Sequence, residues 1–324
     1  MKAQHVLLAA IGLAVAVPNA TAQVYPTRPI TIVVPFAAGG PTDTIARMMA
    51  EPMRAALGQP VIIENAVGAG GSLGVGRVAR AAPDGYTVSI GNWSTHVVNG
   101  AIYALPYDLL NDLEPVALLA TNPQLIVTKN SVPARDVKQL IGWLKENGGK
   151  ATAGTAGAGS ASHIGGIFFE NLTGTRFQFA PYRGTAPAMQ DLAAGHIDLM
   201  FDQAINSLPQ VRAGNIRAYA VTSKSRHVLL PDVPTVDEAG LPGFYISVWH
   251  ALWISKGTPK EIIAKLNAAV VEALAEPKVR QRLADLAQEI PLRQEQTPSA
   301  LHAFQKAEIE KWWPLIKAAN IKGE

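Results

Sequence analysis

Two glycine-rich turns contain the residues whose types and spacing are best suited to chemistry. In the first, Gly39 and Gly40 end an apolar run, and Pro41 follows, whose missing amide hydrogen costs nothing at the first position of a helix. The amides of Thr42 and Asp43 then have no intrahelical acceptor. Because a helix start presents free N–H donors and the positive end of the helix dipole, this turn is a candidate site for a carboxylate or phosphate. An ordinary strand-to-helix turn would show the same pattern.

A second turn of this kind, residues 157–162, precedes another helical pattern and adds hydroxyl groups at Ser160 and Ser162. Two such helix starts facing one cleft would hold one anionic ligand between them. Asp43 conflicts with this interpretation, because its charge stabilises the first turn of its own helix but repels a carboxylate placed there. We therefore expect either that Asp43 turns aside into a structural hydrogen bond or that the ligand carries a positive group nearby.

Nucleotide-binding and catalytic motifs fit the sequence poorly. Neither glycine pair is followed by the lysine of a P-loop, and in "GAGGSLGVG" the third glycine of a dinucleotide-binding turn is replaced by Leu73. Residues 70–74 match the G-x-S-x-G motif of α/β-hydrolases, with Ser72 as the nucleophile. However, "NAVGAG" separates the preceding strand from Ser72, so helix capping is the better interpretation. The seven histidines form no metal-binding motif, and we predict neither a metal, nor a cofactor, nor an enzymatic activity.

Composition and charge narrow the class of protein. The chain has 324 residues, no cysteine, 16% charged residues and a formal net charge of +3, which indicates a globular protein and not a nucleic-acid-binding one. Residues 1–22 combine Lys2, an apolar stretch and the small-residue site Ala20-Thr21-Ala22, the pattern of a cleaved secretory signal peptide. A membrane anchor is the alternative, but Pro18 interrupts the apolar run before it reaches about 20 residues. We therefore expect a periplasmic protein.

Apolar, β-rich runs alternate with helical patterns, which predicts an α/β fold of mostly parallel sheets flanked by helices. Strands are expected in "ITIVVPF", "VIIEN", "YTVSIG" and "PQLIVTK", and further along in "FQFAPYRG", "HIDLMFDQ" and "IRAYAVTS". Helices are expected over residues 42–57, 72–82, 259–275, 278–288 and 298–319. Two α/β domains fit a chain of this length, and the three C-terminal helices are predicted to wrap around them.

These segments also resemble a known family. The motifs "PFAAGGPTDTIAR", "GQPVIIENAVGAGGSLG", "AAPDGYTV", "SASHIGG", "PYRGTAPAMQDL" and "LPDVPTVDEAGLPGF" together resemble the Bug family, the periplasmic substrate-binding subunits of tripartite tricarboxylate transporters. The resemblance covers nearly the whole chain after residue 22. It implies a two-lobed Venus-flytrap protein, expected to be a monomer, that captures a small carboxylate and delivers it to the membrane permease subunits.

The chain crossings that such a two-lobed protein needs are expected near Asn122 and Thr222. Lobe 1 would then comprise residues 23–122 and 223–324, and lobe 2 residues 123–222. The strands "VALLAT" and "YAVTS" would carry the hinge. Closure of the two lobes around the ligand would produce the form that docks on the permease.

The resemblance also implies which residues hold the ligand. Its carboxylate is expected between the two turns, partly through ordered water, with Asp202 at a strand end facing the cleft. Ala158 and Ser162 stand where the family usually has asparagine and glutamine, which weakens any contact made from these positions. The residues carried over are Phe36, Ala38, Gly39, Gly40, Thr42 and Asp43 in the first turn and Thr155, Ala158, Gly159, Ser160 and Ser162 in the second.

Departures from the family pattern suggest the type of ligand. A tryptophan stands within "NWSTH", residues 92–96, where the family usually has small residues. Aromatic walls would favour an aromatic acid by stacking, so a para-dicarboxylate such as terephthalate is the first expectation. The alternatives are an aliphatic dicarboxylate or a nicotinate-like acid, with the tryptophan a plain core residue. The residues placed on these walls are Phe36, Asn92, Trp93, His96 and Trp249.

Overall fold

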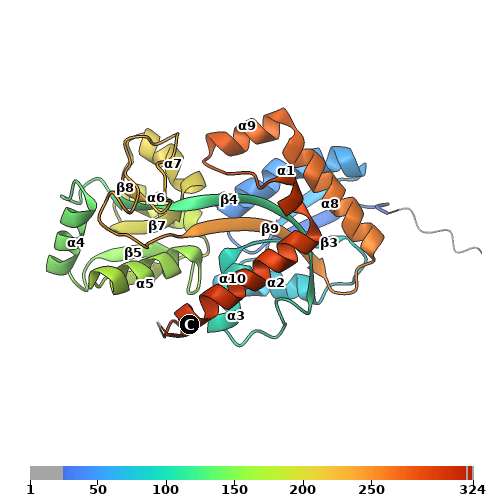
Figure 1. Ribbon diagram of the computed structural model, residues 1–324, viewed down its shortest axis with the longest axis horizontal. Helices are drawn as coiled ribbons and strands as arrows, with labels where there is room; N and C mark the ends of the chain where they lie inside the picture. Colours follow the sequence, from blue (N-terminus) through green and yellow to red (C-terminus); the bar gives the residue numbers. More distant parts are fainter. Residues whose placement is uncertain (1–24, 319, 323–324) are drawn as a thin grey trace, which may run out of the picture.

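The computed structural model describes residues 25–318 and 320–322 as two lobes joined by long strands (Figure 1). The predicted signal peptide, residues 1–22, lies outside the described residues. One lobe carries the N-terminal and C-terminal parts of the described chain, and the middle of the chain builds the other. Among the described residues, no helix is both long enough and apolar enough to cross a bilayer.

The sheet of lobe 1 is mixed. β1 (Ile30–Val34) pairs in parallel with β2 (Val61–Asn65) and β3 (Thr87–Asn92), whereas β9 (Ser247–Ser255) is antiparallel to both β3 and β4 (Leu113–Lys129). β1 is a run of β-branched residues and is almost entirely buried, as expected for a strand in a sheet covered on both faces. Within this lobe, the predicted parallel pairing holds for β1, β2 and β3, whereas β9 is antiparallel to its two neighbours.

Helices cover both faces of this sheet. In α1 (Pro41–Leu57), the buried residues Ile45, Met49 and Met53 recur every four residues and pack in one core cluster with α8 (Lys260–Ala275). The first helix ends at Gly58, whose φ of 70° favours glycine. The other helical segments of lobe 1 are η1 (Ala69–Gly71), α2 (Ser72–Ala79), η2 (Ser94–Val98), α3 (Asn99–Ile102), α9 (Pro277–Asp285), η3 (Arg293–Gln296) and α10 (Pro298–Ala318).

Lobe 2 repeats the arrangement with other strands. β5 (Thr152–Thr155) pairs in parallel with β6 (Gln178–Pro181) and β7 (Leu199–Gln203), and the second half of β4 is antiparallel to β7 and β8 (Ile216–Val221). Because the carboxyl ends of parallel strands lie at one edge, the helices that follow β5, β6 and β7 all begin at the same edge. The helices of this lobe are α4 (Val137–Glu146), α5 (Ala161–Thr173), α6 (Thr185–Ala194) and α7 (Ala204–Arg212).

β4 crosses from one lobe to the other (Figure 1). It pairs with β9 as far as Pro123, and from Gln124 onward it pairs with β7 and β8. This change of partner lies next to the crossing expected near Asn122. One continuous strand therefore belongs to the sheets of both lobes, which suits the hinge predicted for this segment.

The second crossing differs from the prediction near Thr222. Residues 223–246 remain with lobe 2, because the amide of Val236 donates to the carbonyl of Val221 and the ring of Phe244 packs against Phe201, with centroids 6.1 Å apart. The apolar side chains of this segment complete the core of lobe 2, and the chain returns to lobe 1 only where β9 begins.

Candidate functional site

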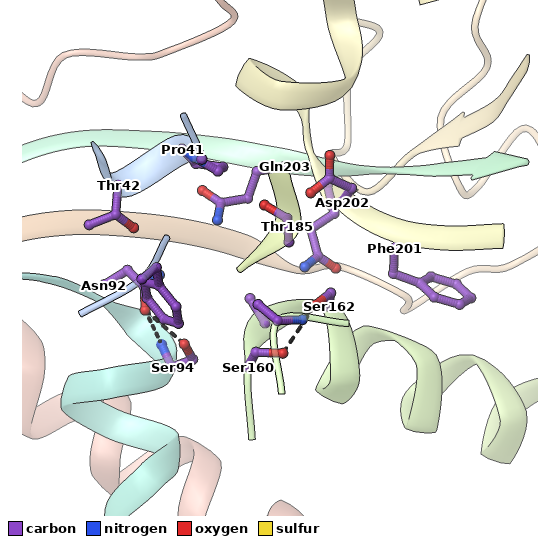
Figure 2. A pocket seen from close by; sticks show the side chains of 15 residues that line it. Pro41, Thr42, Asn92, Ser94, Ser160, Ser162, Thr185, Phe201, Asp202 and Gln203 are labelled. Atoms are coloured by element: carbon purple, nitrogen blue, oxygen red, sulfur yellow. Dashed lines mark hydrogen bonds between the residues drawn. The ribbon is translucent and has the colours of Figure 1, made fainter. Parts of the chain in front are cut away.

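A cavity lies where the two lobes meet (Figure 2). Its walls are formed by the ends of strands and the first turns of helices from both lobes. The space inside is about 20 Å³ at the scale of a water molecule, enough for one or two waters. The lining residues are Phe36, Gly40, Pro41, Thr42, Asn92 and Ser94 from lobe 1 and Gln124, Ala156, Ser160, Ala161, Ser162, Thr185, Phe201, Asp202 and Gln203 from lobe 2.

Four helices begin at this cavity. Thr42 lies in the first turn of α1, Ser160 caps α5, Thr185 is the first residue of α6, and Gln203 is the N-cap of α7. Each helix start carries a partial positive charge of about half an elementary charge. Among the described lining residues there is no lysine, arginine or histidine. The cavity is therefore a candidate anion site, whose donors among the described residues would be helix starts and amides and not cationic side chains. The sequence indicated two of these starts, and the fold adds α6 and α7.

In the first turn, the conflict over Asp43 is settled by its position. Asp43 does not line the cavity. Its Oδ2 accepts hydrogen bonds of 2.8 Å from the amide of Gly39 and from Nε of Arg47, and its Oδ1 accepts from Asn65 at 3.0 Å. Burial raises the pKa of this carboxyl, but these hydrogen bonds outweigh burial and lower it. Asp43 is thus an ionised structural residue that turns aside from the ligand, the first of the two predicted alternatives.

In the second turn, two hydroxyl groups face the cavity. Ser160 and Ser162 are joined through their Oγ atoms at 3.0 Å, as Figure 2 shows, and the amide of Ala156 donates to Oγ of Ser162 at 3.0 Å. His163 does not line the cavity, and its Nδ1 accepts from the amide of Gly159 at 3.0 Å. Burial lowers the pKa of His163 to about 4, so the ring is neutral near pH 7. The turn therefore offers hydroxyls and amides but no cation.

Two lining side chains carry buried polar atoms without hydrogen-bond partners within the described chain. Both amide atoms of Gln124 and Oδ1 of Asp202 are in this position. Unpartnered buried polar groups are rare because desolvation costs about 1–3 kcal/mol each. These atoms are therefore available to a ligand. Sequence reasoning identified Asp202 but missed Gln124, and the available signal was the polar segment that contains Asn122 and Gln124 in the middle of a long, mostly apolar strand.

The prediction that Trp93 stacks on the ligand is wrong. Its side chain is fully buried, does not line the cavity, and packs edge-on against Trp312 of α10, with ring centroids 4.8 Å apart. The prediction for His96 is wrong for the same reason, because its ring is buried and stacks on Trp253 at 3.5 Å. Asn92 does line the cavity, but its Oδ1 caps the following turn by accepting from the amide and hydroxyl of Ser94.

Trp249 is also absent from the lining. It borders a separate cavity between β4, β9 and α10, and its Nε1 donates to Glu308 at 3.4 Å. The neighbouring His250 is buried behind the wall, where its Nε2 lies 3.2 Å from Oγ1 of Thr42. His250 therefore orients a lining hydroxyl and does not contact the cavity itself. Of the three predicted aromatic walls, only Phe36 remains.

The remaining predicted site residues of the two turns lie outside the cavity, and some of them contact the other lobe. Ala38 and Gly39 are exposed at the outer rim, and Thr155 is buried beneath the second turn. The carbonyl of Ala158 accepts a 2.8 Å hydrogen bond from the hydroxyl of Tyr103 in lobe 1. Gly159 is positioned so that an added Cβ would overlap the side chain of Ile102, also in lobe 1. Ala158 and Gly159 therefore contact lobe 1 in the closed arrangement, and none of these residues lines the cavity.

The lobes are closed in this structure. Besides the bond between Tyr103 and Ala158, the amide of Ala37 in lobe 1 donates to the carbonyl of Arg183 in lobe 2 at 2.9 Å. Both bonds join residues that must separate when the lobes open. Lobe closure and enclosure of the cavity are therefore the same event.

Replacing Tyr103 with phenylalanine is expected to weaken ligand binding roughly twofold to tenfold. One neutral hydrogen bond contributes about 0.5–1.5 kcal/mol, and this one forms between the lobes. Titration calorimetry would measure the change. Tyr107→Phe is the matched control, because the Tyr107 hydroxyl donates to the carbonyl of Ser72 within lobe 1. Equal losses of affinity in both variants would contradict a role in closure.

Ser72 does not form a catalytic site. It is the first residue of α2 and follows the N-cap Gly71, so it is not the cap expected from the sequence. It does not line the cavity between the lobes. Within the described residues, no hydrogen bond joins its hydroxyl to a histidine, as a hydrolase triad requires.

A two-lobed α/β body that encloses a cavity between its lobes is the architecture of a solute-binding protein. Comparison with known proteins identifies the family: residues 45–321 match the family described as tripartite tricarboxylate transporter family receptor. The chain belongs to this family, which confirms the predicted α/β two-lobed fold and the assignment as a binding protein and not an enzyme.

Solved structures agree with this assignment. The periplasmic binding protein BugD is 40% identical, with a TM-score of 0.89 over 93% of this chain and 100% of that one. MatC from Rhodopseudomonas palustris, solved with bound malate, is 40% identical, with a TM-score of 0.88 over 90% and 100%. Rpa4515 of R. palustris, solved with adipate, is 33% identical, with a TM-score of 0.87 over 93% and 100%.

Proposed function

We propose that this protein captures a small aliphatic dicarboxylate in the periplasm and delivers it to the permease subunits of a tripartite tricarboxylate transporter. The observation that carries the proposal is the cavity ringed by four helix starts without a cationic side chain. One ligand carboxylate would bind between α1 and α5, and the other would bind on the side of α6, α7 and Gln124. The solved relatives with malate and adipate support ligands of this class.

The walls of the cavity favour an aliphatic ligand over terephthalate, the first expectation from the sequence. Two aromatic residues, Phe36 and Phe201, are among the described lining residues, but the ring of Phe201 packs into lobe 2, against Phe169 at 5.1 Å and Phe244 at 6.1 Å, which leaves little of it for stacking on a ligand.

A thermal-shift screen would test the proposal. Malate, succinate or adipate, at about 100 times its Kd, is expected to stabilise the protein by about 2.7 kcal/mol, which raises Tm by roughly 5–10 °C. Terephthalate and nicotinate at the same concentration are expected to give smaller shifts. Larger shifts with the aromatic acids would restore the expectation from the sequence. Turnover of a chromogenic ester that disappears in Ser72→Ala would favour the hydrolase alternative.

The proposed mode of action also includes the oligomeric state and the partner. A single closed two-lobed chain encloses the whole cavity, so we expect a monomer, which sedimentation would test with and without malate. Only the closed form presents both lobes together to the permease. The permease partners follow from membership of the receptor family.

A further inference from the structure

One lining residue can change its charge. Among the described residues that line the cavity, Asp202 is the only titratable one, and its side chain is fully buried. Its Oδ2 accepts hydrogen bonds from Ser207 Oγ at 2.6 Å and from Asn206 Nδ2 at 2.8 Å, whereas Oδ1 has no partner. Figure 2 shows the carboxyl group beside Thr185 and Gln203 at the lobe 2 wall.

The residues that face Asp202 carry no charge. They are Leu125 on β4, Thr185 on α6, and Asn206 and Ser207 on α7. Most charged or titratable residues on the surrounding elements have other partners: Lys129 with Asp198, Asp191 with Tyr182, Asp43 with Arg47, His163 with Phe179, His250 with Thr42, Glu170 with the amide of Phe177, and Arg217 with the carbonyl of Ala134. Arg212 lies in the last turn of α7, at the opposite end from Asp202. Among the described residues, no cation acts on the Asp202 carboxyl, so none would offset a second negative charge placed beside it.

A ligand carboxylate in the cavity places such a charge there. Burial raises the pKa of Asp202 to about 6, although hydrogen bonds from Ser207, Asn206, the backbone of Gln203 and the side chain of Thr185 act in the opposite direction. Two carboxylates that share one site cannot both ionise easily, so one pKa rises strongly. The start of α7 favours the ionised form, but a like charge in direct contact outweighs this effect in a buried site.

We propose that the protein takes up one proton together with its ligand, and that Oδ1 of Asp202 holds this proton and donates it to a ligand carboxylate oxygen. The inference rests on the proposed function, since it requires a carboxylate in the cavity. The proton comes from solvent and returns there when the ligand leaves. The unpartnered oxygen then gains an acceptor, and the ligand gains a donor from a residue that would otherwise repel it.

The pH dependence follows from the direction of the shift. The pKa of Asp202 is higher with ligand bound than without it, so affinity is highest below the ligand-free value, which is about 6. Above that pH affinity falls by about tenfold per pH unit until the pKa of the bound form is reached. Both carboxyls of succinate and malate are largely ionised from pH 6.5 to 8, although the charge of the first carboxylate raises the pKa of the second above the ordinary value of about 4. The slope in this window therefore reports the protein.

Titration calorimetry with succinate and malate at pH 6.5, 7.25 and 8 would test the inference. At pH 7.25, two buffers of different ionisation enthalpy are expected to show uptake of close to one proton by the wild-type protein. Affinity is expected to fall about thirtyfold from pH 6.5 to 8. Whatever its affinity at pH 6.5, Asp202→Asn, which cannot titrate, is expected to lose the slope over this pH range. Asp232→Asn, an exposed control in lobe 2, is expected to keep it.

Binding without proton uptake would overturn the inference and leave the proposed function intact. A strong preference for malate over succinate in that case would show an ionised Asp202 that accepts from the ligand hydroxyl. Failure of both acids to bind at every pH would overturn the inference and count against the proposed function. Proton uptake is measured on the wild-type protein, so the test does not depend on the folding of any variant.

Discussion

Replacing Gly70 with alanine is expected to weaken ligand binding at least about a hundredfold while both lobes remain folded. Gly70 lies in η1 of lobe 1 with φ of 58°, and an added Cβ would overlap the carbonyl oxygen of Ala158 in lobe 2. A backbone atom cannot swing away as a side chain can. The overlap exists only in the closed arrangement, so the variant penalises closure and not the fold of either lobe. A hundredfold loss corresponds to about 2.7 kcal/mol against the closed form.

Gly58→Ala is the matched control for this variant. Gly58 has a similar φ of 70° at the end of α1, but no atom lies within 4 Å of the position where its Cβ would be. Both variants bear the same left-handed backbone strain, about 1 kcal/mol, and only Gly70→Ala adds the overlap between the lobes. Calorimetry would give the affinities, and small-angle scattering would show whether the variant stays open with ligand present. Unchanged affinity in Gly70→Ala would refute the coupling of closure to binding.

Replacing Trp93 with alanine is expected to lower the free energy of unfolding by about 3–5 kcal/mol. Trp93 is fully buried beside Trp312, so the substitution leaves a large cavity between η2 and α10. Chemical denaturation would measure the loss. Trp143→Ala on α4 is the comparison, because Trp143 is only partly buried and its loss is expected to cost less.

The affinity of folded Trp93→Ala for malate is expected to change by less than about threefold, because the side chain does not line the cavity. This separates the core role from the stacking role that the sequence suggested. A selective loss of affinity for aromatic acids, with stability unchanged, would show instead that Trp93 contacts the ligand.

The sequence by itself determined the features whose physics is local. The glycine pair before Pro41 predicted a helix start, and α1 begins at Pro41. The second turn predicted another, and Ser160 caps α5. Helix caps, glycines and apolar periodicity act over a few residues, so the sequence predicts helix starts and ends without knowledge of the tertiary structure. The combination of such motifs along the chain was specific enough to indicate the receptor family, which the match over residues 45–321 confirmed.

The tertiary structure decided which side chains meet at the cavity. Asn92 and Ser94 line it, whereas Trp93 between them enters the core, because the turn after β3 is held by the Asn92 side chain and α10 covers one side of it. The sequence also predicted Asp43 at the site, but the orientation of its side chain depends on a hydrogen bond from Asn65, which lies 22 positions later in the chain. Such directions follow from packing between distant segments and leave no local pattern.

The number of helix starts at the cavity, and the closure that brings them together, also depend on the whole fold. β5, β6 and β7 are parallel, so α5, α6 and α7 begin at one edge, and only the crossing of β4 between the lobes brings α1 to face them. The bond from Ala37 to Arg183 joins residues far apart in the chain. The sequence determined that anion-binding helix starts exist, because their donors are local. The tertiary structure decided how many converge and which oxygen of Asp202 they leave unpartnered, because convergence depends on long-range strand order and lobe closure.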